Sequence, residues 1–248
     1  MRSIMFATII ASIFVVGAFA QDEITPVLYF SFEEEDDEII DVSGNGNNGT
    51  IFGEGNFVEG KYGMGIELGG PDTIDVLHSD TLVFLDELTV GVWVNLEAVA
   101  NQKIIGKSPI GSGWVLGVNG GIYPEVWDKN GTNHTITQGS VTAGEWTHLA
   151  MTYNTDTEQM LLYINGEQVA ELANGGNPIG DTNNQMVIGA SPWGKDWTSA
   201  GIYDEIKLYN VAFDADQVVN MLMEEGVGSA AVSANGKISS LWGEIKIY

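Results

Sequence analysis

The segment Leu88-Thr-Val-Gly-Val-Trp-Val-Asn-Leu96 constrains the fold more than any other part of the chain. Aliphatic residues stand at every second position of this segment, and threonine, glycine, tryptophan and asparagine fill the positions between them. A period of two places the aliphatic side chains on one face of an extended strand. The segment therefore predicts a β-strand whose aliphatic face lies against a hydrophobic core.

Short apolar segments of this kind recur along the chain and are separated by glycines. Glycine accounts for 32 of the 248 residues, nearly twice its usual share of ~7%. Short strands with regular turn signals predict an all-β fold, a sandwich or barrel of antiparallel strands. Asn165-Gly166 predicts a two-residue hairpin turn of a primed type, since both residues tolerate a positive φ. We expect a hairpin within 111–133 and strands at 27–32, 88–96, 146–154, 159–164, 167–172, 186–190 and 202–209.

One short helix is expected near the C-terminal end. Asp214 is suited to cap its N-terminus, and Gln217, three residues later, completes a capping box. Val218 and Met221 fall on one apolar face, and Gly226 fits the position that follows a helix end. We expect this helix to pack over one end of the sandwich.

The first 20 residues have the features of a secretory signal peptide. Arg2 supplies a positive charge, an apolar run covers 4–16, and Ala18-Phe19-Ala20 forms a cleavage motif. The alternative is a membrane anchor, but the apolar run is shorter than the ~20 residues that a span needs. We therefore expect an exported protein, secreted or held in the periplasm or at the cell surface, with no membrane span in the mature chain. Its parts would be a signal peptide at 1–20, a domain at 21–226 and a C-terminal extension at 227–248.

The composition limits the possible partners. The formal net charge is −25, and loss of Arg2 with the signal peptide would make the mature chain more acidic. Such a charge repels phosphate backbones and anionic membranes, which argues against nucleic acid as a partner. Carboxylates suit calcium, although acidity can also serve solubility alone. The chain has no cysteine, so disulfides, thiolate metal sites and cysteine nucleophiles are excluded.

Six groups of motifs follow one another between residues 27 and 226. They are Phe30-Ser-Phe-Glu33 with Asp41-Val-Ser-Gly-Asn-Gly-Asn-Asn-Gly-Thr50, Gly60-Lys-Tyr-Gly-Met-Gly-Ile-Glu-Leu68, Leu88-Thr-Val-Gly-Val-Trp-Val94, Gly144-Glu-Trp-Thr-His-Leu-Ala-Met-Thr-Tyr153, Leu162-Tyr-Ile-Asn-Gly166, and Ile202-Tyr-Asp-Glu-Ile-Lys-Leu-Tyr-Asn210. In this order they resemble the laminin-G-like jelly-roll domains of the concanavalin A-like lectin/glucanase superfamily. The resemblance implies an all-β, two-sheet antiparallel jelly-roll sandwich with one short C-terminal helix. Members of this family bind glycans, bind proteins or accompany enzymes, so the resemblance does not fix a function.

The loop at 41–49 is a candidate calcium site. Ca²⁺ takes six to eight oxygen ligands, and this loop combines a carboxylate with amide oxygens and flexible backbone. The resemblance implies that the loop meets Asp204, which stands in a strand where an apolar residue would be expected. The alternative is an Asx-turn loop in which Asp41 satisfies its own backbone and Asp204 accepts hydrogen bonds from the loop. The expected ligands of a structural Ca²⁺ are Asp41, Asn45, Asn47, Asp204 and Glu33.

Aromatic residues in polar segments indicate a carbohydrate site. Trp193 and Trp197 lie in the polar segment 191–198, and Tyr123 and Trp127 lie in the hairpin expected at 111–133. Sugars stack their C–H faces on aromatic rings, and exposed aromatics on loops are a functional hint. The alternative is that these rings cover the ends of the sandwich.

The carboxylate spacing argues against catalysis. Glucanases of the superfamily carry Glu-x-Asp-x-Glu on one strand, so that alternation aims the carboxylates at one face. Here Asp204 and Glu205 are adjacent, which predicts opposite faces, and position 207 is lysine. The three histidines share no metal-ligand spacing, and no Gly-x-Ser-x-Gly motif occurs.

We therefore expect no catalytic residues and a monomeric, non-catalytic binding module that recognises a glycan or glycoprotein. Two alternatives stay open at this point. One is a protein-interaction or adhesion domain without sugar affinity. The other is a glycoside hydrolase or lyase, which would need paired inward carboxylates in a groove.

Overall fold

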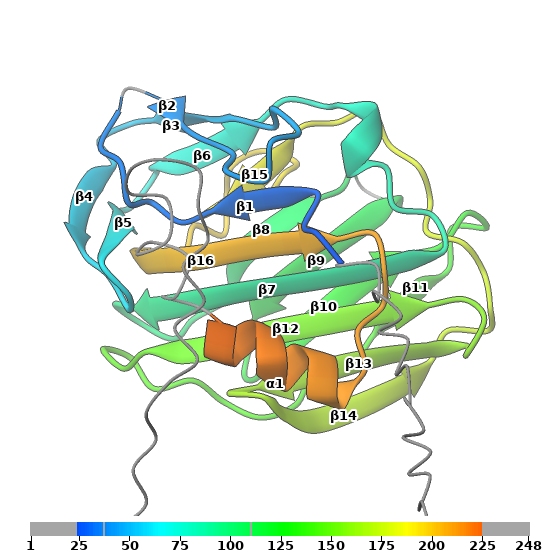
Figure 1. The fold of residues 1–248 in the computed structure, drawn as a ribbon. Helices are drawn as coiled ribbons and strands as arrows, with labels where there is room; N and C mark the ends of the chain where they lie inside the picture. The colour runs from blue at the N-terminus through cyan, green and yellow to red at the C-terminus, as the bar shows by residue number, and fades with distance from the viewer. Residues whose placement is uncertain (1–23, 37, 110, 225–248) are drawn as a thin grey trace, which may run out of the picture.

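The computed structural model describes residues 24–36, 38–109 and 111–224. The described chain forms a sandwich of two antiparallel sheets, each of eight strands, with one α-helix. Figure 1 shows one sheet in front, under the helix, and the other behind it. The predicted all-β two-sheet sandwich with a short C-terminal helix is confirmed. The expected signal peptide, Gly226 and the extension at 227–248 lie outside the described residues.

The front sheet, here called sheet A, has the strand order β14-β13-β12-β7-β16-β5-β4, and β1 pairs with β16. The turn between β13 and β14 has φ values of 51° at Asn165 and 80° at Gly166, as a primed turn requires. The strands that were expected in this sheet are confirmed to within a few residues. Their bounds are β1 Leu28–Phe30, β4 Asn56–Glu59, β5 Met64–Leu68, β7 Glu87–Leu96, β12 Thr147–Asn154, β13 Gln159–Ile164, β14 Glu167–Ala173 and β16 Gly201–Tyr209.

The rear sheet, sheet B, has the order β11-β10-β9-β8-β15-β6-β3-β2. Only the hairpin β9–β10 and the strand β15 were expected from the sequence. Strand β8 escaped notice because its register shifts between Lys103 and Ile105, so that Ile104 and Ile105 both join the core and alternation is lost. The bounds are β2 Glu38–Ile39, β3 Gly49–Phe52, β6 Thr73–Val76, β8 Gln102–Lys107, β9 Gly113–Val118, β10 Ile122–Trp127, β11 Asn133–Thr135 and β15 Met186–Ile188, and a 3₁₀ turn, η1, spans Asp80–Leu82.

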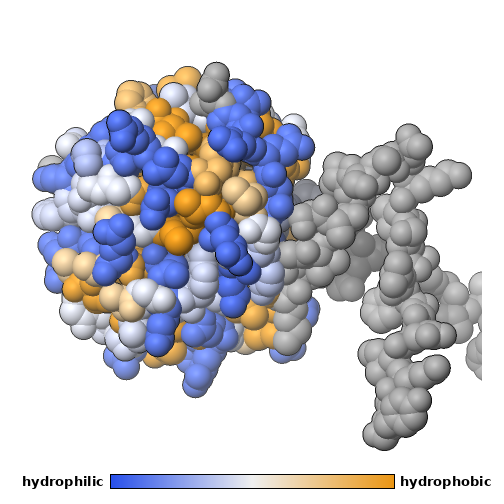
Figure 2. Space-filling model, turned by 90° about the vertical axis from the view of Figure 1, so that its left-hand side faces the viewer, coloured by the Kyte–Doolittle hydropathy of each residue, from blue (hydrophilic) through white to orange (hydrophobic). Residues whose placement is uncertain are grey.

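One hydrophobic core fills the space between the two sheets. All five aliphatic residues that alternate along β7, from Leu88 to Leu96, are buried in it, which confirms the predicted core face. On the side of the molecule where β4 and β5 lie, small hydrophobic areas are bordered by hydrophilic residues (Figure 2). The fold therefore rests on burial between the sheets, and the surface on this side of the molecule is of mixed character.

The helix α1, Ala215–Glu224, begins at the predicted capping box. The backbone N–H of Gln217 donates to Oδ1 of Asp214 at 2.8 Å, and the N–H of Asp214 donates to Oε1 of Gln217 at 2.9 Å. These two bonds satisfy donors that a helix start otherwise leaves without partners.

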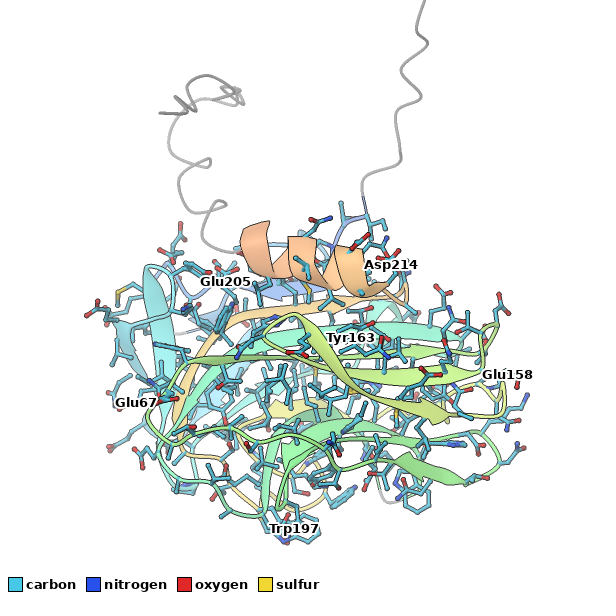
Figure 3. All side chains as sticks on the ribbon, turned by 90° about the horizontal axis from the view of Figure 1, so that it is seen from below. Glu67, Glu158, Tyr163, Trp197, Glu205 and Asp214 are labelled. Atoms are coloured by element: carbon cyan, nitrogen blue, oxygen red, sulfur yellow. The ribbon has the colours of Figure 1, made fainter. Side chains whose placement is uncertain are left out.

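The helix lies along the outer face of sheet A (Figures 1 and 3). The expectation that it would pack over one end of the sandwich was therefore wrong. Val218 and Met221 are buried there in a second apolar cluster. A Cβ atom at Gly91 of β7 would lie 2.6 Å from Cε of Met221, so glycine makes room for the helix. The helix covers part of the outer face of sheet A and does not contact the outer face of sheet B.

Candidate ligand-binding site

Three predicted aromatic residues meet around one lysine on the outer face of sheet B. The Nζ atom of Lys103 lies 4.6 Å from the ring centroid of Tyr123, 5.0 Å from that of Trp193 and 5.3 Å from that of Trp197. The two tryptophan rings stand nearly perpendicular, at 81° and 5.3 Å between centroids. We call these four residues the Lys103 cage. Figure 3 shows Trp197 on the side of the sandwich opposite α1.

Sheet register brings Lys103 and Tyr123 to the same row. Lys103 of β8 pairs with Gly117 of β9, and Gly117 pairs with Tyr123 of β10. A Cβ atom at Gly117 would lie 2.9 Å from the Tyr123 ring, so the missing side chain lets Tyr123 lie over β9 towards Lys103. The cage thus depends on a small residue between its two strand-borne members.

The two tryptophans come from the loop at 191–199, which is held in an uncommon backbone conformation. Lys195 and Trp197 have φ values of 57° and 51°, in the left-handed region that bulky residues rarely adopt. The N–H of Lys103 donates to the carbonyl of Trp197 at 2.9 Å, and the N–H of Ser199 donates to the carbonyl of Gly189 at 2.7 Å. Residues in such conformations persist only where the surroundings hold them, and they cluster at functional sites.

An ion pair between Lys195 of this loop and Asp75 of β6, here called the latch, holds the other side of the loop. Nζ of Lys195 lies 2.8 Å from Oδ2 of Asp75 and 3.7 Å from the ring centroid of Phe52. Asp75 is buried, and it also accepts hydrogen bonds from Gln185 Nε2 at 2.6 Å and from Thr73 Oγ1 at 3.0 Å. The loop therefore spans sheet B, anchored on β6 by Lys195 and on β8 by the backbone of Lys103.

Burial and one nearby carboxylate set the electrostatics of the cage. Burial lowers the pKa of Lys103, and the negative charge of Glu125 raises it in part. Burial also raises the pKa of Tyr123 well above its usual range, and Glu125 adds to this shift. An ammonium held by aromatic faces in a partly desolvated place gains about 1–2 kcal/mol from each good contact. Lys103 thus contacts all three rings and helps to hold them together.

Glu125 links the cage to Trp127, the fourth predicted aromatic residue. Tyr123, Glu125 and Trp127 alternate along β10 and share its outer face. The Nε1 atom of Trp127 donates to Oε1 of Glu125 at 3.2 Å. The structure thus brings all four predicted ligand-binding residues to one face.

Lys103 and Glu125 were missed by the sequence reasoning. The Tyr-x-Glu-x-Trp alternation on β10 was the available signal for Glu125. The signal for Lys103 is weaker, since it is one charged residue at the start of a strand whose alternation is broken.

Exposure separates the residues that support the site from the one best placed to meet a ligand. Trp197 is 43% exposed, whereas Lys103 is only 3% exposed and Tyr123 is also buried. Trp127, Glu125 and Trp193 are half-buried. The outer face of sheet B thus presents an exposed indole for stacking and, on the strand that carries Tyr123, a carboxylate that can accept hydrogen bonds.

The residues expected to bind calcium lie in two separate places. Asp41 uses Oδ1 to accept the N–H groups of Tyr29 and Ser43, each at 3.0 Å, and Oδ2 to accept that of Asn47 at 2.9 Å. The side-chain amide groups of Asn45 and Asn47 both donate to the carbonyl of Val27, at 3.2 Å and 2.8 Å. The loop is closed by its own hydrogen bonds, as in the Asx-turn alternative.

Asp204 and Glu33 contact another loop, at 60–64. Oδ2 of Asp204 accepts the N–H of Tyr62 at 2.9 Å, and Oε1 of Glu33 accepts that of Met64 at 3.3 Å. The expected meeting of Asp41 and Asp204 was therefore wrong, because Asp204 takes its hydrogen bonds from a different loop. Within the described residues, no group of three or more aspartate, glutamate or histidine side chains is placed to hold a metal. The five expected ligands thus contact two different loops, and calcium stays a prediction from the sequence.

A β-bulge changes the orientation of the two adjacent carboxylates on β16. The register shifts between Asp204 and Lys207, and Glu205 has a φ of 51°. Glu205 accepts the hydroxyl of Tyr29 at 2.7 Å and lies 3.1 Å from Nζ of Lys207, both on the outer face of sheet A. Asp204 pairs with Trp93, which also points outward.

The expectation of opposite faces for Asp204 and Glu205 was thus wrong, because the bulge adds a residue to the alternation. Both residues are buried. Burial, with the neighbouring charge of Glu205, raises the pKa of Asp204 to about 8 against the backbone hydrogen bonds that lower it. The two carboxylates therefore serve to hold strands and loops together at this position.

Comparison with known proteins identifies the family of this fold. A family profile described as the concanavalin A-like lectin/glucanases superfamily matches residues 68–219. The chain belongs to this superfamily. A search of curated proteins found no significant match to the sequence. Among the described residues, no helix combines the length and apolar composition that crossing a membrane requires.

Solved structures of the same fold include binding domains of toxins and a domain of an arabinanase. The binding domain of Paraclostridial Mosquitocidal Protein 1 is 18% identical, with a TM-score of 0.68 over 80% of this chain and 52% of its own. Domain 4 of AbnA, an extracellular arabinanase from Geobacillus stearothermophilus solved with arabinotriose, is 23% identical, with a TM-score of 0.67 over 81% of this chain and 100% of its own. The botulinum neurotoxin serotype D ligand-binding domain, solved with N-acetylneuraminic acid, is 16% identical, with a TM-score of 0.63 over 81% and 51%. The chain thus spans about half the length of the toxin domains, and at these identities the likeness shows the jelly-roll fold.

Proposed function

We propose that this protein is a non-catalytic carbohydrate-binding module whose ligand stacks on Trp197, on the outer face of sheet B. The observation that carries this proposal is the exposure of Trp197 at 43% while its backbone is held in a left-handed conformation. A bulky residue persists in this backbone conformation only where the surrounding structure holds it, and such residues cluster at functional sites.

The chemistry of the site suits a sugar. The C–H face of a sugar ring packs against the indole of Trp197, and a hydroxyl donates to the carboxylate of Glu125. The cage and the latch fix the loop before the ligand arrives, so little conformational entropy is lost on binding. The arabinotriose, a neutral sugar, in one neighbouring structure supports a sugar as the ligand.

Isothermal titration calorimetry and affinity gel electrophoresis against a panel of soluble polysaccharides test this proposal. We expect Trp197→Ala to weaken binding about tenfold, which corresponds to the loss of one stacking contact. Leu85→Ala is the matched control, because Leu85 is also 43% exposed but lies outside the site. Equal affinity of Trp197→Ala and the wild type would remove this residue from the site. It would also favour the protein-interaction alternative, or a sugar site elsewhere.

Export is a separate part of the proposal and rests on the sequence features of residues 1–20. Expression of the full chain with its natural leader, followed by N-terminal sequencing of protein from the medium or periplasm, tests it. We expect the mature protein to begin at Gln21. Retention of the whole chain inside the cell would contradict this part and leave the binding site unaffected.

A further inference from the structure

The segments around the exposed indole of Trp197 carry both acidic and basic side chains, and the basic ones already have partners within the chain. Glu125 is half-buried on the outer face of β10, which also carries Tyr123 of the cage, and Asp196 is exposed next to Trp197 in its loop. Lys103 is nearly inaccessible, with its ammonium enclosed by the three rings of the cage. Lys195 of the same loop is paired with Asp75. Both ammonium groups are thus already engaged by partners within the chain, whereas the carboxylate of Asp196 is exposed to an approaching ligand.

The whole chain adds to this local field. Its formal net charge is −25, so the potential at its surface opposes the approach of anions. Salt screens this field over about 8 Å at physiological ionic strength, whereas contacts within the site are screened much less. A carboxylate or sulfate group on the ligand would thus be opposed both at a distance and on contact.

The hydrogen-bonding character of Glu125 leads to the same conclusion. An ionised carboxylate only accepts hydrogen bonds, and it has about four positions for them. Trp127 takes one position on Oε1. A hydroxyl of the ligand can donate to another, whereas an ionised acid on the ligand offers no proton and adds a second negative charge.

We propose that the site binds neutral glycans and excludes those that carry uronic acid, sialic acid or sulfate groups. A neutral sugar stacks on Trp197 and donates hydroxyl protons to Glu125, and the charge of the site contributes specificity by repelling acidic competitors. This ligand class rests on the proposed function, since it assigns the chemistry of the same site.

The test uses the wild-type protein and two charge variants on an array of neutral and acidic glycans. The site variant is Glu125→Gln with Asp196→Asn, which removes one carboxylate from β10 and one from the loop of Trp197. The control variant is Asp156→Asn with Glu167→Gln, which makes the same change in net charge at two exposed positions of sheet A hairpins. Each glycan is measured at low and at physiological salt.

We expect the wild type to retain neutral glycans with little dependence on salt. The site variant should bind those glycans about two- to fivefold more weakly, because it lacks the ionised acceptor, and should gain retention of acidic glycans. The control variant should match the wild type on both classes.

Two results overturn the ligand class, and they differ in what they say about the proposed function. Preference of the wild type for acidic glycans, lost in Trp197→Ala and weakened by salt, contradicts the ligand class but supports a carbohydrate site. An array on which the wild type retains no glycan contradicts both.

Discussion

The latch between Lys195 and Asp75 allows the sharpest test of how the site is built. Lys195→Met removes the ammonium that contacts Asp75, Thr73 and the Phe52 ring, and keeps an unbranched apolar side chain of similar length. Lys195 points away from the Lys103 cage, so any effect on ligand binding has to travel through the 191–199 loop. The variant therefore separates support of the loop from contact with the ligand.

The structure sets the expected size of the effect. Loss of the ammonium leaves the carboxylate of Asp75, 5% exposed, without its cation, although Gln185 and Thr73 still donate to it. The Lys195 side chain is 34% exposed, which places the pair between a surface and a buried ion pair. We expect a loss of about 1–2 kcal/mol in the stability of the loop. The left-handed conformations at Lys195 and Trp197 cost roughly 1–2 kcal/mol each, so a weakened latch lets the loop leave them.

Circular dichroism and ligand titration measure the two consequences. The rings of Trp193 and Trp197 are close enough to couple electronically, which gives a circular dichroism signal in the far ultraviolet. This signal should be weaker in Lys195→Met than in the wild type, and should match the wild type in Lys195→Arg, which keeps the positive charge. Apparent affinity for the ligand should fall in proportion to the fraction of molecules with an ordered loop, about three- to tenfold. Urea unfolding shows whether the domain itself remains folded. An unchanged tryptophan signal with unchanged affinity in Lys195→Met would refute the idea that this latch positions the loop.

Three further predictions follow from other parts of the structure. In the folded state the pKa of Asp204 is raised from 3.8 to about 8, so its contribution to stability is present below about pH 4 and is lost as the pH rises towards 8. Urea titrations should show that the free energy of unfolding decreases by up to about 1.4 kcal/mol per pH unit over this range. Asp204→Asn should flatten that slope. A slope unchanged in the variant would assign the pH dependence to other carboxylates. Since hydrogen bonds close the loop of Asp41, EDTA should leave the melting temperature of the protein unchanged, and a fall reversed by added CaCl₂ would instead support the calcium site expected from the sequence. Asp214→Ala should lower the stability by about 1 kcal/mol through loss of the helix cap, whereas Asp216→Ala, in the same first turn, should cost less than half as much; equal costs would mean that the capping bond contributes nothing.

Much of the fold was predictable because its signals are local. The alternation in 88–96 named the core face of β7, Asn165-Gly166 named a hairpin turn, and Asp214 with Gln217 named the start of α1. Each of these signals depends on residues within a few positions of one another. The order of the motifs extended this local information to the two-sheet architecture.

The errors arose where an inserted residue or a distant partner decides the outcome. The bulge at Glu205 placed two adjacent carboxylates on one face, and the bulge between Lys103 and Ile105 concealed β8. Asp204 met the 60–64 loop in place of the Asp41 loop, because the pairing of β5 with β16 brings that loop to it. Alternation rules assume an unbroken ladder, and the positions of bulges cannot be read from them.

The sequence by itself determined the type of chain: an acidic, cysteine-free β-sandwich whose polar segments carry tryptophans. Only the tertiary structure decided that Tyr123, Trp193 and Trp197 surround Lys103, and that Glu125 connects them to Trp127. The reason is that the residues of the cage lie far apart in the chain. The pairing of β8, β9 and β10 and the anchoring of the 191–199 loop bring them together. Periodicity fixes which face a residue occupies, but neighbours across a sheet are set by the pairing of whole strands.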